Sequence, residues 1–464
     1  MLCTTSNGMK ITFYGATQQV TGSNFLLEHG GKKILVDCGL FQGSKFAETL
    51  NYSPFPYDPE EIDFVFLTHS HADHSGRLPK LYKDGFRGKV YATKPTIDLS
   101  AIALEDNLDL IKDEARKDGH EPLFGAGDLH QVFLLAQGVE YGDELDLGND
   151  IKVIFHDAGH ILGSAIIEVD WKNKQGELKS IYFSGDLGNY PVPLLKHYDM
   201  PNQADYVVTE STYGDRLHGK NIDKKEILRQ VIEETIKKGG TLMIPTFAIE
   251  RTQELLYEIN ELIEHEHLPK IPVFLDSPLA IKLTKVYKNY ERYFNKKVTH
   301  DIRAGDDIFN FPGLHLTFSS QESKAINNLK FSKIVIAGSG MSLGGRILFH
   351  ERNYLPYPNS TILFVGYQVE GSPGRQILDG KKEVKILGQK VEINCQVRSI
   401  EGYSAHADQG MLMDWVGKAK QDGNLKKVFV THGEYHSSSV LAGKIREEIN
   451  VETVVPEMGE SFEL

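Results

Sequence analysis

The chain has 464 residues, of which 40% are hydrophobic and 25% are charged, as in ordinary globular proteins with two or three domains. No apolar run approaches the roughly 18 residues that a membrane span needs, and the start lacks the charged and apolar segments of a secretory signal. Three cysteines give no disulfide framework. We therefore expect a cytoplasmic protein with no membrane partner.

The net charge of −13 is evidence against a generally basic nucleic-acid-binding protein. The charge is uneven, however. Residues 211–400 contain 27 Lys and Arg against 22 Asp and Glu, a net of +5, whereas the remainder contains 24 against 42, a net of −18. This division fits either an insert that faces a polyanion or a merely solvated surface.

Alternating apolar residues and glycines predict antiparallel strands at 9–15, 23–30 and 32–39. The next segment, 63–68, reads "DFVFLT" and predicts a strand with both faces buried. Helical spacing follows at 96–117. Further strands are predicted at 151–160, 164–171 and 179–186.

After residue 211, predicted helices and strands alternate, starting with a helix at 224–240 for which Asp223 is a candidate cap. The alternation indicates a mostly parallel sheet covered by helices. Short strands return after 391. We therefore expect an α/β chain in which one domain is interrupted by a second, with parts at 1–210, 211–390 and 391–464.

The segment "THSHADHSG" places His69 and His71 directly after a predicted strand. Residues i and i+2 of extended backbone point to the same side, so both imidazoles can reach one metal. Asp73 and His74 lie past the bend and can face a second metal about 3.5–4 Å away. Such a concentration of donors after an apolar strand predicts a metal site.

Three further donors follow other predicted strands: His160, Asp186 and His432. Each lies near a glycine at a strand-to-loop junction. Taken singly, each residue is more often structural than a ligand, but as a set they share one edge of a sheet assembly. The donor types fit Zn²⁺ best, with Mn²⁺ or Fe²⁺ as the alternatives.

The ordered motifs "VDCG", "HSHADH", "GHILGS" and "FSGD" resemble the metallo-β-lactamase superfamily. The motifs "TESTYG", "GYSAHAD", "VTHGE", "GSGMSLGGR" and "GYQVEGSPGRQILDG" resemble its β-CASP branch, especially the RNA-specific nucleases of pre-mRNA 3′-end processing and their prokaryotic counterparts. The resemblance covers nearly the whole chain. It implies a four-layer αββα sandwich with an inserted α/β β-CASP domain.

The resemblance also implies the roles of individual residues. One zinc ion would be held by His69, His71 and His160, the other by Asp73, His74 and His432, and Asp186 would bridge both. Asp73 is thereby also a candidate catalytic residue. Asp37 would orient a ligand histidine by a hydrogen bond; the alternative is an Asp that forms a turn before Gly39.

"YSAHADQG" near the C-terminus looks like a reduced copy of "HSHADHSG", but too few donors remain for a separate catalytic metal site. A histidine that holds no metal can donate a proton to a leaving alkoxide. By resemblance His406 is this general acid and Glu210 orients it; a carboxylate at a strand end is the alternative for Glu210.

The expected reaction is hydrolysis of RNA phosphodiester bonds by a two-metal hydroxide, leaving 5′-phosphate ends. RNA is favoured over DNA because His432 stands where DNA-directed relatives typically have valine. The alternatives are a DNA-acting β-CASP nuclease, a small-molecule hydrolase such as a lactonase or thioesterase, and a non-catalytic scaffold. Cleavage mode (endonuclease or 5′-exonuclease) and a homodimer are left open.

Two glycine-rich segments contain candidate phosphate-binding residues, Ser339, Gly340 and Ser372. "GSGMSLGGR" lacks the spacing of a dinucleotide-binding loop, but it follows a predicted strand, so its amides can face an RNA phosphate. Tight packing of loop against helix is the alternative. Ser372-Pro373 departs from the family pattern, in which "EGT" precedes a small or apolar residue.

Overall fold

The computed structural model describes residues 8–43, 45–219, 223–266, 268–400 and 402–464. Its chain contacts divide it into two compact units. The described residues of Met1–Pro191, Lys196–Leu217 and His406–Leu464 form the first, here called the sandwich unit. Those of Val192–Leu195 and His218–Ala405 form the second, here called the inserted unit. Each is described by itself.

The sandwich unit contains two seven-stranded sheets. The first has the order β22 (Ser461–Glu463), β1 (Lys10–Phe13), β2 (Phe25–His29), β3 (Lys32–Val36), β4 (Phe64–Phe66), β5 (Lys89–Thr93) and β6 (Ala136–Val139). Its neighbours are antiparallel from β22 to β3, as the sequence predicts for 9–39, and parallel from β3 to β6.

The second sheet has the order β21 (Glu452–Val454), β20 (Lys427–Val430), β11 (Tyr206–Thr209), β10 (Leu178–Phe183), β9 (Ala165–Lys172), β8 (Ile151–Asp157) and β7 (Glu144–Gly148). Strands β21, β20, β11 and β10 are parallel, whereas β10, β9, β8 and β7 alternate in direction. As a result β8, β10, β11 and β20 all run the same way.

The main core of the sandwich unit lies between the two sheets and includes Phe13, Phe66, Phe155 and Phe183. On β4, Phe66 belongs to this core, whereas Val65 belongs to a second cluster between the first sheet and the helices on its outer face. Both faces of this strand are therefore buried, as predicted.

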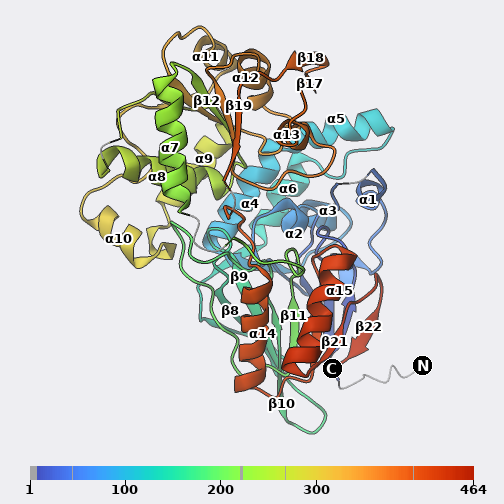
Figure 1. Ribbon diagram of the computed structural model, residues 1–464. Helices are drawn as coiled ribbons and strands as arrows, with labels where there is room; N and C mark the ends of the chain where they lie inside the picture. The colour runs from blue at the N-terminus through green and yellow to red at the C-terminus, as the bar shows by residue number, and fades with distance from the viewer. Residues whose placement is uncertain (1–7, 44, 220–222, 267, 401) are drawn as a thin grey trace. The chain divides into compact units, whose positions relative to one another are not determined.

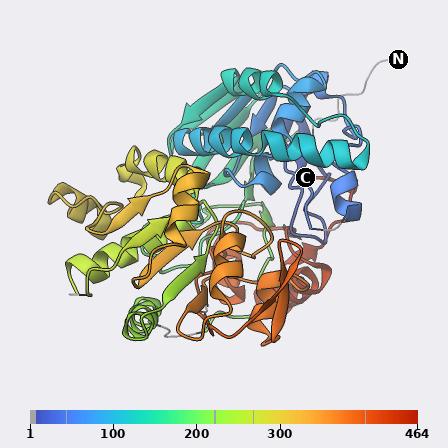
Figure 2. The same ribbon diagram turned by 90° about the horizontal axis from the view of Figure 1, so that it is seen from above.

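Helices cover the outer face of each sheet. The first sheet has α1 (Lys45–Thr49), η1 (Pro59–Glu61), α2 (Ala72–Ser75), α3 (Leu78–Lys83), α4 (Lys94–Asp106), α5 (Leu108–Asp118) and α6 (Ala126–Leu134) on its side of the unit; the second has α14 (Gln409–Asp422), α15 (Tyr435–Lys444) and η3 (Ile445–Ile449). Figure 1 shows α14 beside α15, and Figure 2 shows α4 and α5 following one another. The predicted αββα sandwich is confirmed.

The inserted unit is built on a six-stranded sheet in which all neighbouring strands are parallel, as the alternating pattern predicts. Its order is β14 (Leu314–Leu316), β13 (Val273–Leu275), β15 (Lys333–Ala337), β12 (Thr241–Pro245), β16 (Thr361–Phe364) and β19 (Gln396–Ser399). A hairpin joins β17 (Glu383–Ile386) to β18 (Gln389–Glu392).

The helices of the inserted unit are α7 (Lys224–Lys237), α8 (Arg251–Glu264), α9 (Pro278–Lys288), η2 (Glu291–Tyr293), α10 (Lys296–Arg303), α11 (Ser320–Ile326), α12 (Ile347–Tyr354) and α13 (Pro373–Leu378). Asp223 caps α7 as predicted, because its side chain accepts a hydrogen bond from the amide of Glu226 at 3.0 Å.

Two details differ from the sequence analysis. The single helix expected at 96–117 is two helices, since α4 ends and α5 begins at Asn107, a residue type that favours helix ends. The strand β19 pairs with β16, so the described residues from 391 to Ala405 group with the inserted unit, and the sandwich unit resumes at His406.

Cys38 and Cys395 are buried free thiols, and Cys3 lies outside the described residues. Within the part of the chain that the structure describes, none of the helices combines the length and apolarity needed to cross a membrane.

Candidate metal centre

The candidate site is made by residues that follow the carboxyl ends of six strands of the sandwich unit. In the first sheet, Asp37 follows β3, and His69 and His71 follow β4. In the second sheet, His160 follows β8, Asp186 follows β10, Glu210 follows β11 and His432 follows β20. Because β3 and β4 share one direction and the other four share another within their sheet, their ends gather the side chains at one edge of the sandwich.

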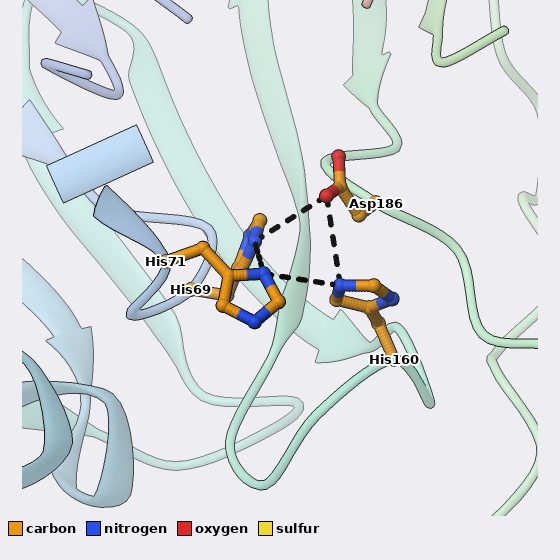
Figure 3. A group of neighbouring side chains, drawn as sticks. All are labelled: His69, His71, His160 and Asp186. Atoms are coloured by element: carbon orange, nitrogen blue, oxygen red, sulfur yellow. Dashed lines mark hydrogen bonds and ion pairs between the residues drawn. The ribbon is translucent and has the colours of Figure 1, made fainter. Parts of the chain in front are cut away.

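The first group of donors contains His69, His71, His160 and one oxygen of Asp186, which converge in Figure 3. Nδ1 of His71 lies 3.0 Å from Nε2 of His69 and 3.3 Å from Nε2 of His160. Oδ2 of Asp186 lies 3.4 Å from Nε2 of His69 and 3.6 Å from Nε2 of His160.

The second group contains Asp73, His74 and His432 and faces the other oxygen of Asp186. Oδ1 of Asp186 lies 3.3 Å from Nε2 of His74 and 3.4 Å from Nε2 of His432. Oδ2 of Asp73 lies 3.9 Å from Nε2 of His432. Asp73 and His74 thus belong to a different group from His69 and His71, although all four lie within six residues.

The two groups have the donor chemistry and spacing of a dinuclear metal site. Tetrahedral Zn²⁺ with Zn–N bonds of about 2.0–2.1 Å places its donors roughly 3.3 Å apart. Burial lowers the pKa of His71 to about 4 and that of His432 to about 3, so both imidazoles are neutral and offer a lone pair. Asp186 is 1% exposed and divides its two oxygens between the groups, which suits a bridging carboxylate.

Asp37 lies behind the second group. Its Oδ2 accepts a hydrogen bond of 2.7 Å from Nδ1 of His74, which leaves Nε2 of that ring directed at Asp186. Its Oδ1 accepts from the amide of Thr68 at 2.8 Å. The orienting role that the resemblance implies for Asp37 therefore has the required geometry, and a turn-forming role alone does not account for these contacts.

Glu210 and His406 form a pair at the border of both groups. Nδ1 of His406 lies 3.2 Å from Oε2 of Glu210 and 3.8 Å from Oδ2 of Asp186. Oε1 of Glu210 also accepts a 2.7 Å hydrogen bond from the amide of Leu187. Burial lowers the pKa of His406, but the carboxylates of Glu210 and Asp186 outweigh this effect and raise it to about 9, so this imidazole is protonated at neutral pH.

Distance alone allows a different arrangement, because Asp186, Glu210 and His406 also lie close enough to hold a metal ion. Glu210 is less suited to that role than the histidine groups, since its carboxylate already accepts the Leu187 amide and the Nδ1–H of His406. Nδ1 is the nitrogen of His406 that is directed at Glu210.

The candidate phosphate-binding residues lie in two loops of the inserted unit that hydrogen-bond to each other, through the amide of Gly374 and the carbonyl of Met341 at 3.3 Å. The hydroxyl of Ser339 accepts from the amides of Leu343 and Gly344, and that of Ser372 caps α13 by accepting from the amide of Arg375. Gly340 is buried. The two hydroxyls thus have structural partners within their own loops.

Several supporting residues escaped the sequence analysis. The amide of Thr68 donates a hydrogen bond to Asp37. Thr68 immediately precedes the histidine motif in "THSHADH", so its position in the sequence could have indicated a role at the site. The hydroxyl of Ser184 accepts from the amide of Glu210 at 3.0 Å, and the Leu187 amide binds its carboxylate. No sequence pattern indicates the last two contacts, because they join segments that are distant in the chain.

Three family profiles match the chain. A metallo-beta-lactamase superfamily domain matches residues 26–184, a Beta-Casp domain matches residues 252–377, and a Zn-dependent metallo-hydrolase RNA specificity domain matches residues 390–456. The first match contains His69, His71, Asp73, His74 and His160. The second lies within the inserted unit, and the third contains His406 and His432.

Named relatives match over most of the chain. The chain is 41% identical over 427 residues to "Ribonuclease TTHA0252" of Thermus thermophilus, covering 92% of this chain and 93% of that protein. It is 31% identical to "Transcription termination factor FttA" of Methanosarcina mazei, covering 96% of this chain and 70% of that protein. A protein of unknown function from Enterococcus faecalis shares the fold, with a TM-score of 0.56, 13% identity and coverage of 98% and 100%.

Proposed function

Since this chain belongs to the metallo-β-lactamase superfamily and to its β-CASP branch, we propose that it is a zinc-dependent ribonuclease that hydrolyses RNA phosphodiester bonds and leaves 5′-phosphate ends. RNA is chosen over other substrates because an RNA specificity domain matches residues 390–456 and a similar protein is named a ribonuclease. A cytoplasmic location and a homodimer remain expectations.

One observation carries the proposal: Asp186 directs Oδ2 at His69 and His160 and Oδ1 at His74 and His432. A buried carboxylate with both oxygens among imidazoles fits two cations better than one. His69, His71 and His160 would hold the first, and Asp73, His74 and His432 the second. Bound zinc ions would supply the Lewis acidity that activates a water and offsets charge on the phosphate.

The protein's own contribution to the reaction is proton transfer and positioning. Water adds to phosphorus, the bond from phosphorus to the 3′-oxygen breaks, and the leaving alkoxide needs a proton. His406 would donate that proton from Nε2, while Glu210 holds Nδ1 and stabilises the charged ring. The products are then a 5′-phosphate and a 3′-hydroxyl.

The experiment that tests this proposal incubates the purified protein with end-labelled RNA, single-stranded DNA and an ester substrate, each with and without a chelator. We expect RNA cleavage that chelation abolishes and that Zn²⁺ restores, and 5′-phosphate ends on the products. Products ending in 2′,3′-cyclic phosphate, or preferential turnover of the ester, would contradict the proposal.

Two substitutions separate the roles of the histidines. His406→Ala is expected to keep two metal ions per chain and to lose about 10²–10⁴-fold in RNA cleavage, the usual contribution of a general acid. His432→Ala is expected to lose metal from one site. Elemental analysis measures the metal content of both variants. Loss of a metal ion from His406→Ala would instead make His406 a ligand together with Asp186 and Glu210.

A further inference from the structure

Two short connections join the inserted unit to the candidate acid. His406 forms an isolated antiparallel bridge with Gly188, and the amide of Ala407 donates to the carbonyl of Leu187 at 2.7 Å. Gly188 is four residues before Val192, where the chain joins the inserted unit, and His406 directly follows Ala405, where the chain leaves it. Both sides of this one bridge therefore continue into the inserted unit.

The first connection is held by Asn295. Its amide donates to the carbonyl of Leu194 at 2.9 Å, and its side-chain Nδ2 donates to the carbonyl of Pro193 at 2.8 Å. Leu195 also bridges Phe294, which is 1% exposed. Residues 193–195 are thus fixed to the inserted unit within a few residues of Gly188.

The second connection is held by Tyr403. Its side chain is 2% exposed, and its hydroxyl donates to the carboxylate of Glu258 on α8. The guanidinium of Arg251 lies 5.0 Å and the ammonium of Lys224 5.4 Å from the centre of its ring. The hydrogen bond to Glu258 and the two cation–π contacts fix Tyr403 to the inserted unit, three residues before His406.

We propose that Tyr403 and Asn295 are positioning residues for the proton donor: they hold the two ends of the Gly188–His406 bridge and so set where Nε2 of His406 lies. The inference rests on the general-acid role proposed above for His406. Only three to five residues of chain separate each anchor from the bridge, and they span at most about 10–18 Å, so a displaced anchor shifts the bridge. Displacement of a catalytic group by about 1 Å can cost roughly 10²-fold in rate.

The test uses two variants that each remove one contact. Tyr403→Phe keeps the ring and loses the hydroxyl. Asn295→Asp loses the Nδ2 donor but keeps an oxygen that caps α10, where Asn295 accepts from the amide of Val298 at 3.0 Å. Each full-length variant is assayed on RNA, whose leaving alkoxide needs a proton, and on bis(p-nitrophenyl) phosphate, whose leaving phenolate does not.

We expect each variant to lose about tenfold or more in kcat on RNA and to stay within about twofold on bis(p-nitrophenyl) phosphate, with His406→Ala showing the same selectivity and a larger loss. Tyr287→Phe is the matched control, because the Tyr287 hydroxyl also donates to a buried carboxylate of the inserted unit, Glu250 at 2.6 Å, but lies on neither connection. Tyr287→Phe should leave the ratio of the activity on RNA to the activity on bis(p-nitrophenyl) phosphate unchanged.

The outcomes separate this inference from the proposed function. If His406→Ala is selective for RNA but Tyr403→Phe and Asn295→Asp are not, the positioning role is wrong and the general acid stands. If His406→Ala loses both activities equally, the general-acid role fails and the inference fails with it. An equal loss of both activities in Tyr403→Phe and Asn295→Asp, with a lowered melting temperature, indicates a purely structural role and also overturns the inference.

Discussion

Asp37 shows how much of the site depends on a residue that is not itself a proposed ligand. Its carboxylate accepts from His74, from Thr68 and from the hydroxyl of Ser23 at 3.2 Å. Asp37 and His432 have φ angles of 62° and 49°, in a region that disfavours residues with a Cβ and that recurs at functional sites. The surrounding contacts hold these two residues in that conformation.

Asp37→Asn is expected to weaken the second metal site by about 10–100-fold in affinity, because Nδ1 of His74 loses its charged acceptor. Competition with a chromophoric chelator measures the affinity. Asp205→Asn serves as the control, since Asp205 is another buried carboxylate of this unit and accepts from the amide of Ser180, away from the site. Equal affinities in Asp37→Asn and the unsubstituted protein would refute the orienting role.

Glu351 predicts a pH dependence of stability in the inserted unit. Burial raises its pKa from 4.5 to about 8, although the hydroxyl of Ser342 donates to it and opposes the shift. A raised pKa means that folding favours the protonated acid, so the stabilisation is complete below about pH 4.5 and is lost as the pH rises through about 8. Glu351→Gln keeps the shape without the charge.

We therefore expect Glu351→Gln to be more stable than the unsubstituted protein at pH 9 by up to about 5 kcal/mol, and within about 1 kcal/mol of it at pH 5. Denaturant unfolding followed by a probe in the inserted unit measures the difference at each pH. The exposed Glu370→Gln is the control. A stability difference that does not grow with pH would show that Glu351 remains ionised or is reached by water.

At the scale of elements, the site depends on the close packing of the loops that follow β8 and β10. A Cβ on Gly188 would lie 2.0 Å from the carbonyl oxygen of Gly159, which directly precedes His160. Gly188 itself lies two residues after Asp186 and pairs with His406. Contact between the backbones of these loops thus brings a proposed ligand, a bridging carboxylate and the candidate acid together.

Gly188→Ala is expected to force these loops apart and to reduce both metal content and RNA cleavage by tenfold or more, since backbone atoms cannot yield as a flexible side chain can. Metal analysis and the RNA assay check this together. Gly443→Ala, on helix α15 with open space around its Cβ, should preserve both properties. Full metal content in Gly188→Ala would show that the loops can separate without consequence.

At the scale of the whole molecule, every proposed metal ligand belongs to the sandwich unit, whereas the inserted unit contributes connections and the candidate phosphate-binding loops. Metal binding therefore stabilises one unit directly, because an ion that binds only the folded state shifts its unfolding equilibrium.

Removal of the metal ions is expected to raise hydrogen exchange in the ligand-bearing segments 67–76, 158–162, 184–189 and 430–434, with the sheet strands β12 and β15 of the inserted unit unchanged. Hydrogen exchange measured by mass spectrometry, with and without chelator, follows both units in one sample. The same comparison in His432→Ala should show a smaller response. Equal deprotection of both units would indicate that the metal ions stabilise the chain as a whole.

The residue pattern predicted the opening antiparallel strands, the parallel sheet of the inserted unit and the donors that the structure gathers, whereas the sandwich was implied by family resemblance. Strand periodicity and residue type are local properties, and a histidine or aspartate just after a buried strand must lie at a sheet edge. Spacing also suggested two groups within "HSHADH", because extended backbone and the following bend send side chains in different directions.

Only the tertiary structure decided which oxygen of Asp186 faces which histidines, that the Leu187 amide binds Glu210, and that His406 pairs with Gly188. It also decided that β19 belongs to the inserted unit's sheet, so that the sandwich resumes at His406 rather than near residue 391. These contacts join residues 23–246 positions apart, and no local pattern encodes the partner of a group at that separation.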